Sequence, residues 1–354
     1  MDPLTQGALG AAAAHVAFGR RLPRRAWLIG ALAGMLADAD VLIRSTADPL
    51  LAIEYHRHFT HALAFIPIGG ALAALPWLAL PAMRRAWPAV LGAALVGYAT
   101  HGLLDACTTY GTRLLWPFSS LRVAWSNVSV IDPVVTLALI AGLVIALRRG
   151  TRRPAAAALC LVIAYLGVGA LQRERALAAV ERVAHAHGHV PVRMDAFPTL
   201  GNQLVWRCLY DSGGTLHALR VRVPWFGPAR WQPGDSAVRV DLDDLPAPAR
   251  ADARVVRDFE RFSHFSAGWT ARPAADPGVI GDMRYSLRTE TFEPVWGVRF
   301  NPGAPQPTQW VNRNRDRRIG ARDAWAELRG AAARYRGLPA MPPAASAHAA
   351  PSVH

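Results

Sequence analysis

The chain has 354 residues, 52% of them hydrophobic, and its 39 basic residues, all arginine, outnumber 25 acidic ones to give a formal net charge of +14. In a soluble protein this charge would favour nucleic acid as a partner, but no binding motif accompanies it and many arginines flank apolar stretches, so we predict no nucleic-acid partner. The three cysteines give no disulfide framework and no paired-cysteine metal motif.

Six apolar stretches occupy the first half of the chain and predict membrane-crossing helices. A helix needs about 20 mainly apolar residues to cross a bilayer core. The first stretch is short and rich in alanine, so it could instead be tilted, re-entrant or incomplete. We therefore expect an α-helical polytopic membrane bundle of about five to six helices over residues 1–172. The stretches are residues 4–18, 26–43, 62–81, 88–107, 130–147 and 155–172.

Arginines follow the first, third and fifth stretches. Because basic loops stay in the cytoplasm, these three loops should be cytoplasmic. The rare His and Asp residues collect at the opposite helix ends, which predicts a multi-pass bacterial inner-membrane protein with a polar cluster on its outer face. The loops hold Arg20, Arg21, Arg24 and Arg25, then Arg84 and Arg85, then Arg148, Arg149, Arg152 and Arg153.

The second half of the chain is less apolar. Residues 173–189 predict an amphipathic linker, residues 190–336 a small β-rich soluble domain on the outer face, and residues 337–354 a disordered tail rich in Pro, Ala, Ser and His. Alternating β-branched and aromatic residues between Pro and Gly turns indicate strands. These are expected at residues 216–226, 237–242, 284–292 and 295–300.

Six histidine and aspartate side chains near the outer helix ends form a predicted metal site. Charged groups at membrane depth are costly unless they pair, reach water or bind an ion. Imidazoles and carboxylates both present lone pairs to a cation, and carboxylates offset its charge. For Asp38 and Asp40 the alternative is an interfacial helix cap made of two solvated carboxylates. The predicted ligands of one or two divalent ions, Zn²⁺ or Mn²⁺/Mg²⁺, are Asp38, Asp40, His56, His61, His101 and Asp105.

Two further residues, Asp132 and Arg57, each have more than one predicted role. Asp132, directly before Pro133, could bind metal, orient a histidine ligand or cap a helix. Arg57 could hold an anionic substrate group through its planar donor fork, or it could pair with Asp38 or Asp105.

The order and spacing of these residues resemble the YdjM-like family of inner-membrane proteins, which are predicted membrane-bound metal-dependent hydrolases. The likeness reaches about residue 300 and implies a metal-assisted hydrolase. Gln6 stands where the family commonly has His, and His58 stands at a usual Gly, where it could add a ligand or crowd the site. The shared motifs are Met1-Asp2-x-x-Thr5, Gly34-x-x-x-Asp38-x-Asp40, His56-Arg57-x-x-Thr60-His61, His101-x-x-x-Asp105-x-x-Thr108-Thr109-Tyr110-Gly111, Ile131-Asp132-Pro133 and, later, Trp206-Arg207 and Asp282-Met283-Arg284-Tyr285.

These observations predict a hydrolase in which metal-activated water attacks an ester or phosphoester, lipid-linked or amphipathic, at the outer membrane face. Asp40 or Asp105 would act as general base, and Arg57 would hold the substrate's negative charge. Membrane lipids are the expected surroundings. The alternative is a non-catalytic membrane protein with a structural metal site or polar clasp and a partner-binding β domain. A transporter is disfavoured because its site would lie near the midplane.

Overall fold

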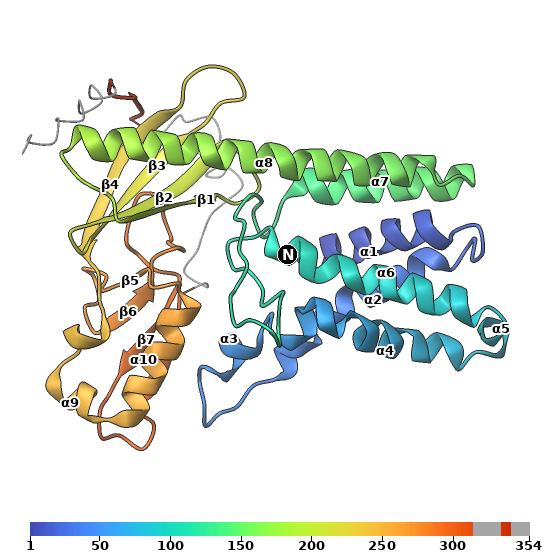
Figure 1. Cartoon of the computed structure of the whole chain (residues 1–354), viewed down its shortest axis with the longest axis horizontal. Coiled ribbons are helices and arrows are strands. Elements are labelled where there is room, and N and C mark those ends of the chain that lie inside the picture. The colour runs from blue at the N-terminus through green and yellow to red at the C-terminus, as the bar shows by residue number, and fades with distance from the viewer. Residues whose placement is uncertain (314–333, 341–354) are drawn as a thin grey trace, which may run out of the picture.

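The computed structural model describes residues 1–313 and 334–340 and has a helical bundle beside a β-rich domain (Figure 1). One long helix, α8, runs through both parts. The helices of the first part are α1 (Pro3–Phe18), α2 (Ala26–Leu36), α3 (Leu51–Tyr55), α4 (Ile66–Leu78), α5 (Pro81–Arg84), α6 (Trp87–Ala106), α7 (Pro133–Arg149) and α8 (Arg153–Ala186), with the short 3₁₀ helices η1 (Ala37–Leu42), η2 (Phe59–His61) and η3 (Leu63–Phe65).

Within the described residues, two helices, α6 and α8, are long and apolar enough to cross a membrane. A bent pair, Leu51–His61 with Leu63–Leu78, raises the number to three if it is one span. The prediction of five to six spans is therefore too high. The reason is helix length, because α1, α2, α4 and α7 have 16, 11, 13 and 17 residues, whereas a crossing helix needs about 20. Gly150, in the left-handed conformation, ends α7.

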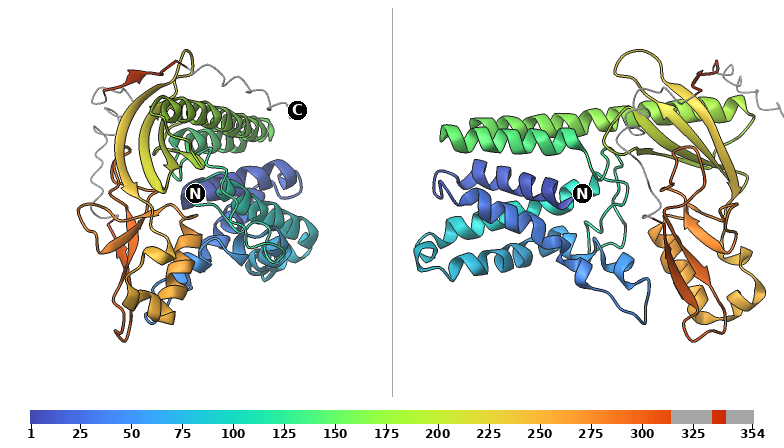
Figure 2. Two further views of the ribbon diagram at one scale, coloured as in Figure 1. Left: turned by 60° about the vertical axis from the view of Figure 1, so that its left-hand side comes forward. Right: turned by 180° about the vertical axis from the view of Figure 1, so that it is seen from behind.

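The two ends of the bundle differ in the residues that they carry. The turn between α1 and α2, the short helix α5 and the turn between α7 and α8 hold the arginine pairs, and all three lie at the end far from the β-rich domain (Figure 1). The view from behind shows the same separation of these turns from the β-rich domain (Figure 2). The helix ends that carry the predicted polar cluster lie at the other end, next to the β-rich domain.

Three helices of the bundle approach each other at glycines. A Cβ atom added to Gly97 of α6 would meet the backbone of Gly30 on α2, and one added to Gly30 would meet the backbone of Gly10 on α1. Small residues at helix contacts are typical of membrane bundles because they let the backbones come close. This contact brings α6, which bears two of the predicted ligands, directly against α2, which bears a third at its end.

Gly97→Ala is expected to destabilise the bundle by about 1–3 kcal/mol, because the added methyl group would meet backbone atoms that cannot rotate away. The matched control is Gly167→Ala on α8, where an added Cβ meets nothing within 4 Å. Unfolding of the detergent-solubilised protein by SDS measures both. Equal stability of the two variants would contradict the close packing of α2 and α6.

The β-rich domain contains two antiparallel sheets. The first has the strand order β1-β2-β3-β4-β9 and the second β5-β6-β7-β8. Two helices, α9 (Ala247–Ala251) and α10 (Ala253–Phe265), and the 3₁₀ helix η4 (Leu242–Asp244) lie between β4 and β5 in the chain, and β9 of the first sheet follows β8 of the second. The strands are β1 (Arg193–Pro198), β2 (Val205–Ser212), β3 (Thr215–Arg222), β4 (Arg230–Val238), β5 (Thr270–Ala271), β6 (Val279–Asp282), β7 (Trp296–Phe300), β8 (Thr308–Asn312) and β9 (Arg336–Gly337).

The predicted strands agree only in part with these. The strand at 295–300 is confirmed as β7, and 216–226 overlaps β3, but 237–242 meets only the end of β4. The strand predicted at 284–292 is wrong. Arg284 there donates to Asp282 and to the carbonyl of Phe265, which anchors a loop instead. Residues 314–333 of the predicted β-rich domain and residues 341–354 of the predicted tail lie outside the described residues, and Gly337, predicted to begin the tail, belongs to β9.

The C-terminal part of α8 forms one layer of the β-rich domain. Its buried residues, Ala176 to Ala184, pack on strands of the first sheet, where Trp206 and Val221 are among the buried partners. The apolar stretch at 155–172 and the linker predicted at 173–189 are thus parts of one 34-residue helix, which ends at Ala186.

The second sheet and α10 contact the bundle next to the polar helix ends. Leu50, just before α3, is fully buried in the apolar core that α10 forms with β6 and β7, and Tyr110 packs against the same core. Arg261 of α10 forms ion pairs with Asp48 at 2.9 Å and Glu54 at 2.6 Å. Burial alone would raise the pKa of Asp48, but the hydrogen bond from Arg261 holds that pKa below its usual value. These contacts fix the loops around the cluster.

Candidate metal site

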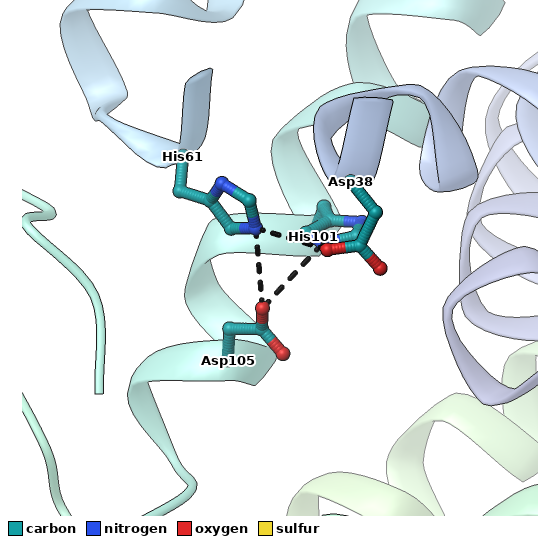
Figure 3. Close-up of side chains that lie close together, drawn as sticks. All are labelled: Asp38, His61, His101 and Asp105. Atoms are coloured by element: carbon teal, nitrogen blue, oxygen red, sulfur yellow. Dashed lines mark ion pairs between the residues drawn. The ribbon is translucent and has the colours of Figure 1, made fainter. Parts of the chain in front are cut away.

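Four side chains from three helix ends converge on one point. His101 and Asp105 lie four residues apart on α6 and therefore share one face of that helix. Asp38 comes from η1 and His61 from η2. Asp38 Oδ1, His61 Nε2, His101 Nε2 and Asp105 Oδ2 all lie within 4.8 Å of one another, and the side chains point toward one another in Figure 3.

The separations of these atoms suit a tetrahedral ion. Asp38 Oδ1 lies 3.4 Å from His61 Nε2 and 3.3 Å from His101 Nε2, and Asp105 Oδ2 lies 3.3 Å and 3.5 Å from the same two nitrogens. Four ligand atoms about 2.0–2.2 Å from a tetrahedral ion are about 3.3–3.6 Å apart. The three buried atoms of the set have no hydrogen-bond partner among the described residues. The donor set thus fits a divalent cation.

Hydrogen bonds at the far side of each imidazole orient the ring. His101 Nδ1 contacts the carbonyl oxygen of Gly34. His61 Nδ1 lies 2.9 Å from Thr60 Oγ1 and 3.3 Å from Asp40 Oδ2. Carbonyl and carboxylate oxygens accept hydrogen bonds, so we assign the proton of each ring to Nδ1, which leaves the Nε2 lone pair facing the cluster.

A strained turn at Arg57 connects Asp40, which lies beside His61, to Asp105 of the cluster. Its φ of 61° lies in the left-handed region, which residues other than glycine rarely adopt. The conformation lets the Arg57 N–H donate to Asp40 Oδ2 at 2.8 Å. The Arg57 side chain places Nε 3.0 Å from Asp105 Oδ2 and donates from Nη1 to Thr108 Oγ1 at 2.7 Å. Arg57 therefore pairs with Asp105, one of the two uses that the sequence left open.

Asp40 and His56 lie beside the four converging atoms. Asp40 Oδ1 is 2.8 Å from His56 Nδ1, and its Oδ2 accepts from Arg57 N–H and from Thr60 Oγ1 at 2.9 Å. Asp38, Asp40 and His56 form a second group with ligand-like spacing. The side chains of His56 and Asp38 are 26% and 22% exposed, whereas those of His61, His101 and Asp105 are fully buried. Solvent thus reaches the cluster on the His56 side.

Two other residues from the sequence analysis lie away from the cluster. Asp132 caps the N-terminus of α7 by accepting from Val134 N–H, and it also accepts from the hydroxyl of Tyr165. His58 contacts Arg113 through Nε2 at 2.7 Å and lies against Trp116. His58 therefore neither joins the four converging atoms nor crowds them.

The structure adds contacts that the sequence analysis missed. Gln6 donates to Asp105 Oδ1 at 2.9 Å, the nitrogen of Met1 also contacts Asp105, and the hydroxyl of Tyr98 donates to the carbonyl of Thr60 at 2.6 Å. Thr60 was visible only as part of a motif. Tyr98 lies on α6, three residues before His101, and nothing in its spacing indicated a contact with Thr60, whereas Gln6 was noted only as a departure from the family's usual His.

Two arginines, Arg57 and Arg122, lie over the ring of Tyr110, which packs against His56 beside the cluster. The Arg57 and Arg122 guanidinium carbons lie 4.8 and 5.1 Å from the centre of the Tyr110 ring. Burial lowers the pKa of Arg122 to about 10; Tyr110 opposes this shift, while Arg284, Arg113 and Arg57 add to it. The pKa of His264 is lowered by burial and by Arg113 and Arg122. Arg113 and Arg122 therefore bring positive charge close to His264, at the end of α10.

Comparison with known proteins supports the resemblance over the helical half of the chain. Residues 1–176 match the model of a family described as YdjM inner membrane protein. No curated protein and no solved structure matches the chain. The match contains all four converging residues and ends before the β-rich domain, so the likeness expected up to about residue 300 stays a prediction beyond residue 176. Through its helical half, residues 1–176, the chain belongs to the YdjM inner membrane protein family.

Proposed function

We propose that this protein is a membrane-bound metal-dependent hydrolase acting on an ester or phosphoester. The observation that carries the proposal is the convergence of His61 Nε2, His101 Nε2 and two carboxylate oxygens, with the buried atoms left without hydrogen-bond partners among the described residues. A divalent ion held by these atoms, Zn²⁺ or Mn²⁺/Mg²⁺, would lower the pKa of a coordinated water and polarise the substrate.

His56 is our candidate for the general base. Asp40 and Asp105 were the sequence-based candidates, but both oxygens of Asp40 already accept hydrogen bonds and Asp105 contacts Arg57 and Gln6. With Asp40 accepting from Nδ1–H, His56 keeps a lone pair on Nε2, and its side chain is partly exposed to solvent. Nε2 would take a proton from the attacking water, and Asp40 would position the ring.

The location of the cluster favours an amphipathic or lipid-linked substrate. The arginine turns lie at the opposite end of the bundle, so basic loops on the cytoplasmic side would orient the cluster and the β-rich domain outward. Large apolar side chains are exposed near the cluster, in the loop that follows α6, and along α8, which supports membrane lipids as neighbours. They include Phe118, Leu121, Trp125, Leu161 and Ile163.

One observation favours the non-catalytic alternative, a polar clasp. Asp105 is fully buried and contacts Arg57 of the loop before η2 as well as Gln6 of α1. A network of this kind holds helix ends together with or without a bound ion.

Hydrolysis assays separate the two functions. The purified full-length protein in neutral detergent, loaded with Zn²⁺ or Mn²⁺, would be tested on nitrophenyl esters, phosphomonoesters and phosphodiesters. We expect turnover that EDTA abolishes and that His56→Ala lowers by about 10²–10⁴-fold, as loss of a general base does. The control variant His185→Ala, at an exposed position of α8 in the β-rich domain, should retain it. Stoichiometric metal without turnover of any class would favour the clasp.

A further inference from the structure

A cleft beside the metal site is lined by three arginines and two glutamates, and two of the arginines, Arg113 and Arg122, form no ion pair among the described residues. It has a volume of about 250 Å³ and lies between the loop after α6 and helix α10. Arg113 and Arg122 reach it from the loop, Leu50 and Ile53 from the start of α3, and Phe265 from the end of α10. Its wall therefore combines two guanidinium groups with an apolar surface.

The hydrogen-bond partners of the two arginines carry no negative charge. Arg122 reaches only the carbonyl oxygens of His56 and Gly111, at 3.4–3.5 Å, and Arg113 contacts the imidazole of His58. The Nε atoms of both arginines are buried and have no hydrogen-bond partner in the described part of the chain. Among those residues, neither guanidinium forms an ion pair with a carboxylate.

Neighbouring arginines are neutralised, which makes these two unusual. Arg261, which also borders the cleft, pairs with Asp48 and Glu54. Arg284 pairs with Asp282 at 2.7 Å. The remaining acidic residue of the cleft, Glu260, is exposed at its edge. Since a buried charge without a counter-ion is costly, the cleft is suited to an anion from outside the chain.

The ring of Tyr110 connects Arg122 of the cleft to the residues around the metal site. Arg122 covers this ring, Arg57 covers it too, and the centre of the His56 ring lies 5.3 Å from its centre. Arg57 in turn contacts Asp105 of the cluster. An anion held by Arg122 would thus lie on the same side of the cluster as His56, its solvent-facing histidine.

We propose that this cleft binds the phosphate of an amphipathic substrate through Arg113 and Arg122, with Leu50, Ile53 and Phe265 contacting the adjoining apolar part. The inference deepens the proposed function, on which it rests, and it transfers to these two residues the anion-binding role that the sequence assigned to Arg57. Planar guanidinium groups suit phosphate oxygens because they donate paired hydrogen bonds.

Calorimetric titration of the full-length protein in neutral detergent tests this inference. The probes are dihexanoyl phosphatidic acid, inorganic phosphate and the phosphate-free dihexanoyl glycerol, each added to metal-loaded and EDTA-treated protein. We expect the phosphatidic acid to bind more tightly than inorganic phosphate, which lacks the apolar contacts, and the phosphate-free lipid not to bind at the site. Equal binding of the two lipids, or of the phosphatidic acid and inorganic phosphate, would overturn the proposal.

Variants assign the binding to the cleft. Arg122→Gln and Arg113→Gln should each weaken the binding of phosphatidic acid by at least about tenfold, as loss of a charged hydrogen bond does. The matched control Arg250→Gln, at an exposed position of α9, should leave this affinity unchanged. Unchanged affinity in both cleft variants would refute the assignment. Binding that persists in EDTA-treated protein supports the cleft even if no hydrolysis is found, so the two proposals fail separately.

Discussion

His101→Ala is expected to purify without its divalent ion, whereas His58→Ala keeps the full complement. His101 supplies one of four atoms at the converging point, and its ring is held there by the Gly34 carbonyl. Changing a group that merely orients a ligand costs about 10–100-fold in metal affinity, so loss of the ligand itself should cost more. Elemental analysis of protein purified in parallel measures the difference.

His58 is a stringent control for this experiment. It lies three residues from His61 in the same polar segment, yet its ring contacts Arg113 and Trp116 rather than the cluster. A general effect of removing an imidazole near the membrane surface would therefore appear in both variants. Equal metal content in the two would refute the ligand set, and with it the metal-dependent mechanism.

Asp105→Ala is expected to destabilise the metal-free protein by about 3–5 kcal/mol, the range found when one partner of a buried ion pair is removed. Asp105 is fully buried and lies 3.0 Å from Arg57 Nε, which would be left as an unpaired buried cation. Unfolding by SDS in the presence of EDTA measures this without any contribution from a metal.

The double variant Asp105→Ala/Arg57→Met identifies the cause. If the unpaired guanidinium is responsible, replacing it with an apolar side chain of similar length should recover a large part of the loss, and the double-mutant cycle should give an interaction energy of about 0.5–3 kcal/mol. A double variant as unstable as the sum of the single ones would assign the loss to packing and to the contacts of Asp105 with Gln6 and the Met1 nitrogen instead.

The convergence of the helix ends was predictable from the sequence because charge placement sorts helix ends in a membrane protein. Arginines after alternate stretches placed Asp38, His61 and His101 at one end, and the structure brings them together. The internal order of the site was not predictable. The left-handed turn at Arg57 and the 3₁₀ helix η1 bring Asp40 into contact with His56. No repeating pattern of residues in the sequence predicts either feature.

The errors in the fold have physical causes as well. Length decides whether an apolar segment can span a bilayer, and the exact helix ends, such as that of α7 at Gly150, depend on backbone conformation. In the second half, α10 was missed within the domain predicted to be β-rich, where no strand had been placed at its position. Its buried Val255, Phe259 and Phe262 recur at the spacing of one helical face, which is the signal that could have found it.

The continuity of α8 limits how this protein can be divided. Apolar residues of its last turns, including Val180 and Val183, form part of the interior beneath the first sheet. A cut at the end of the apolar stretch, near residue 172, would leave the sheet with its covering helix attached, whereas a cut at the first strand would strip that cover and expose Trp206 to water. A fragment for work without detergent should therefore start before Ala176.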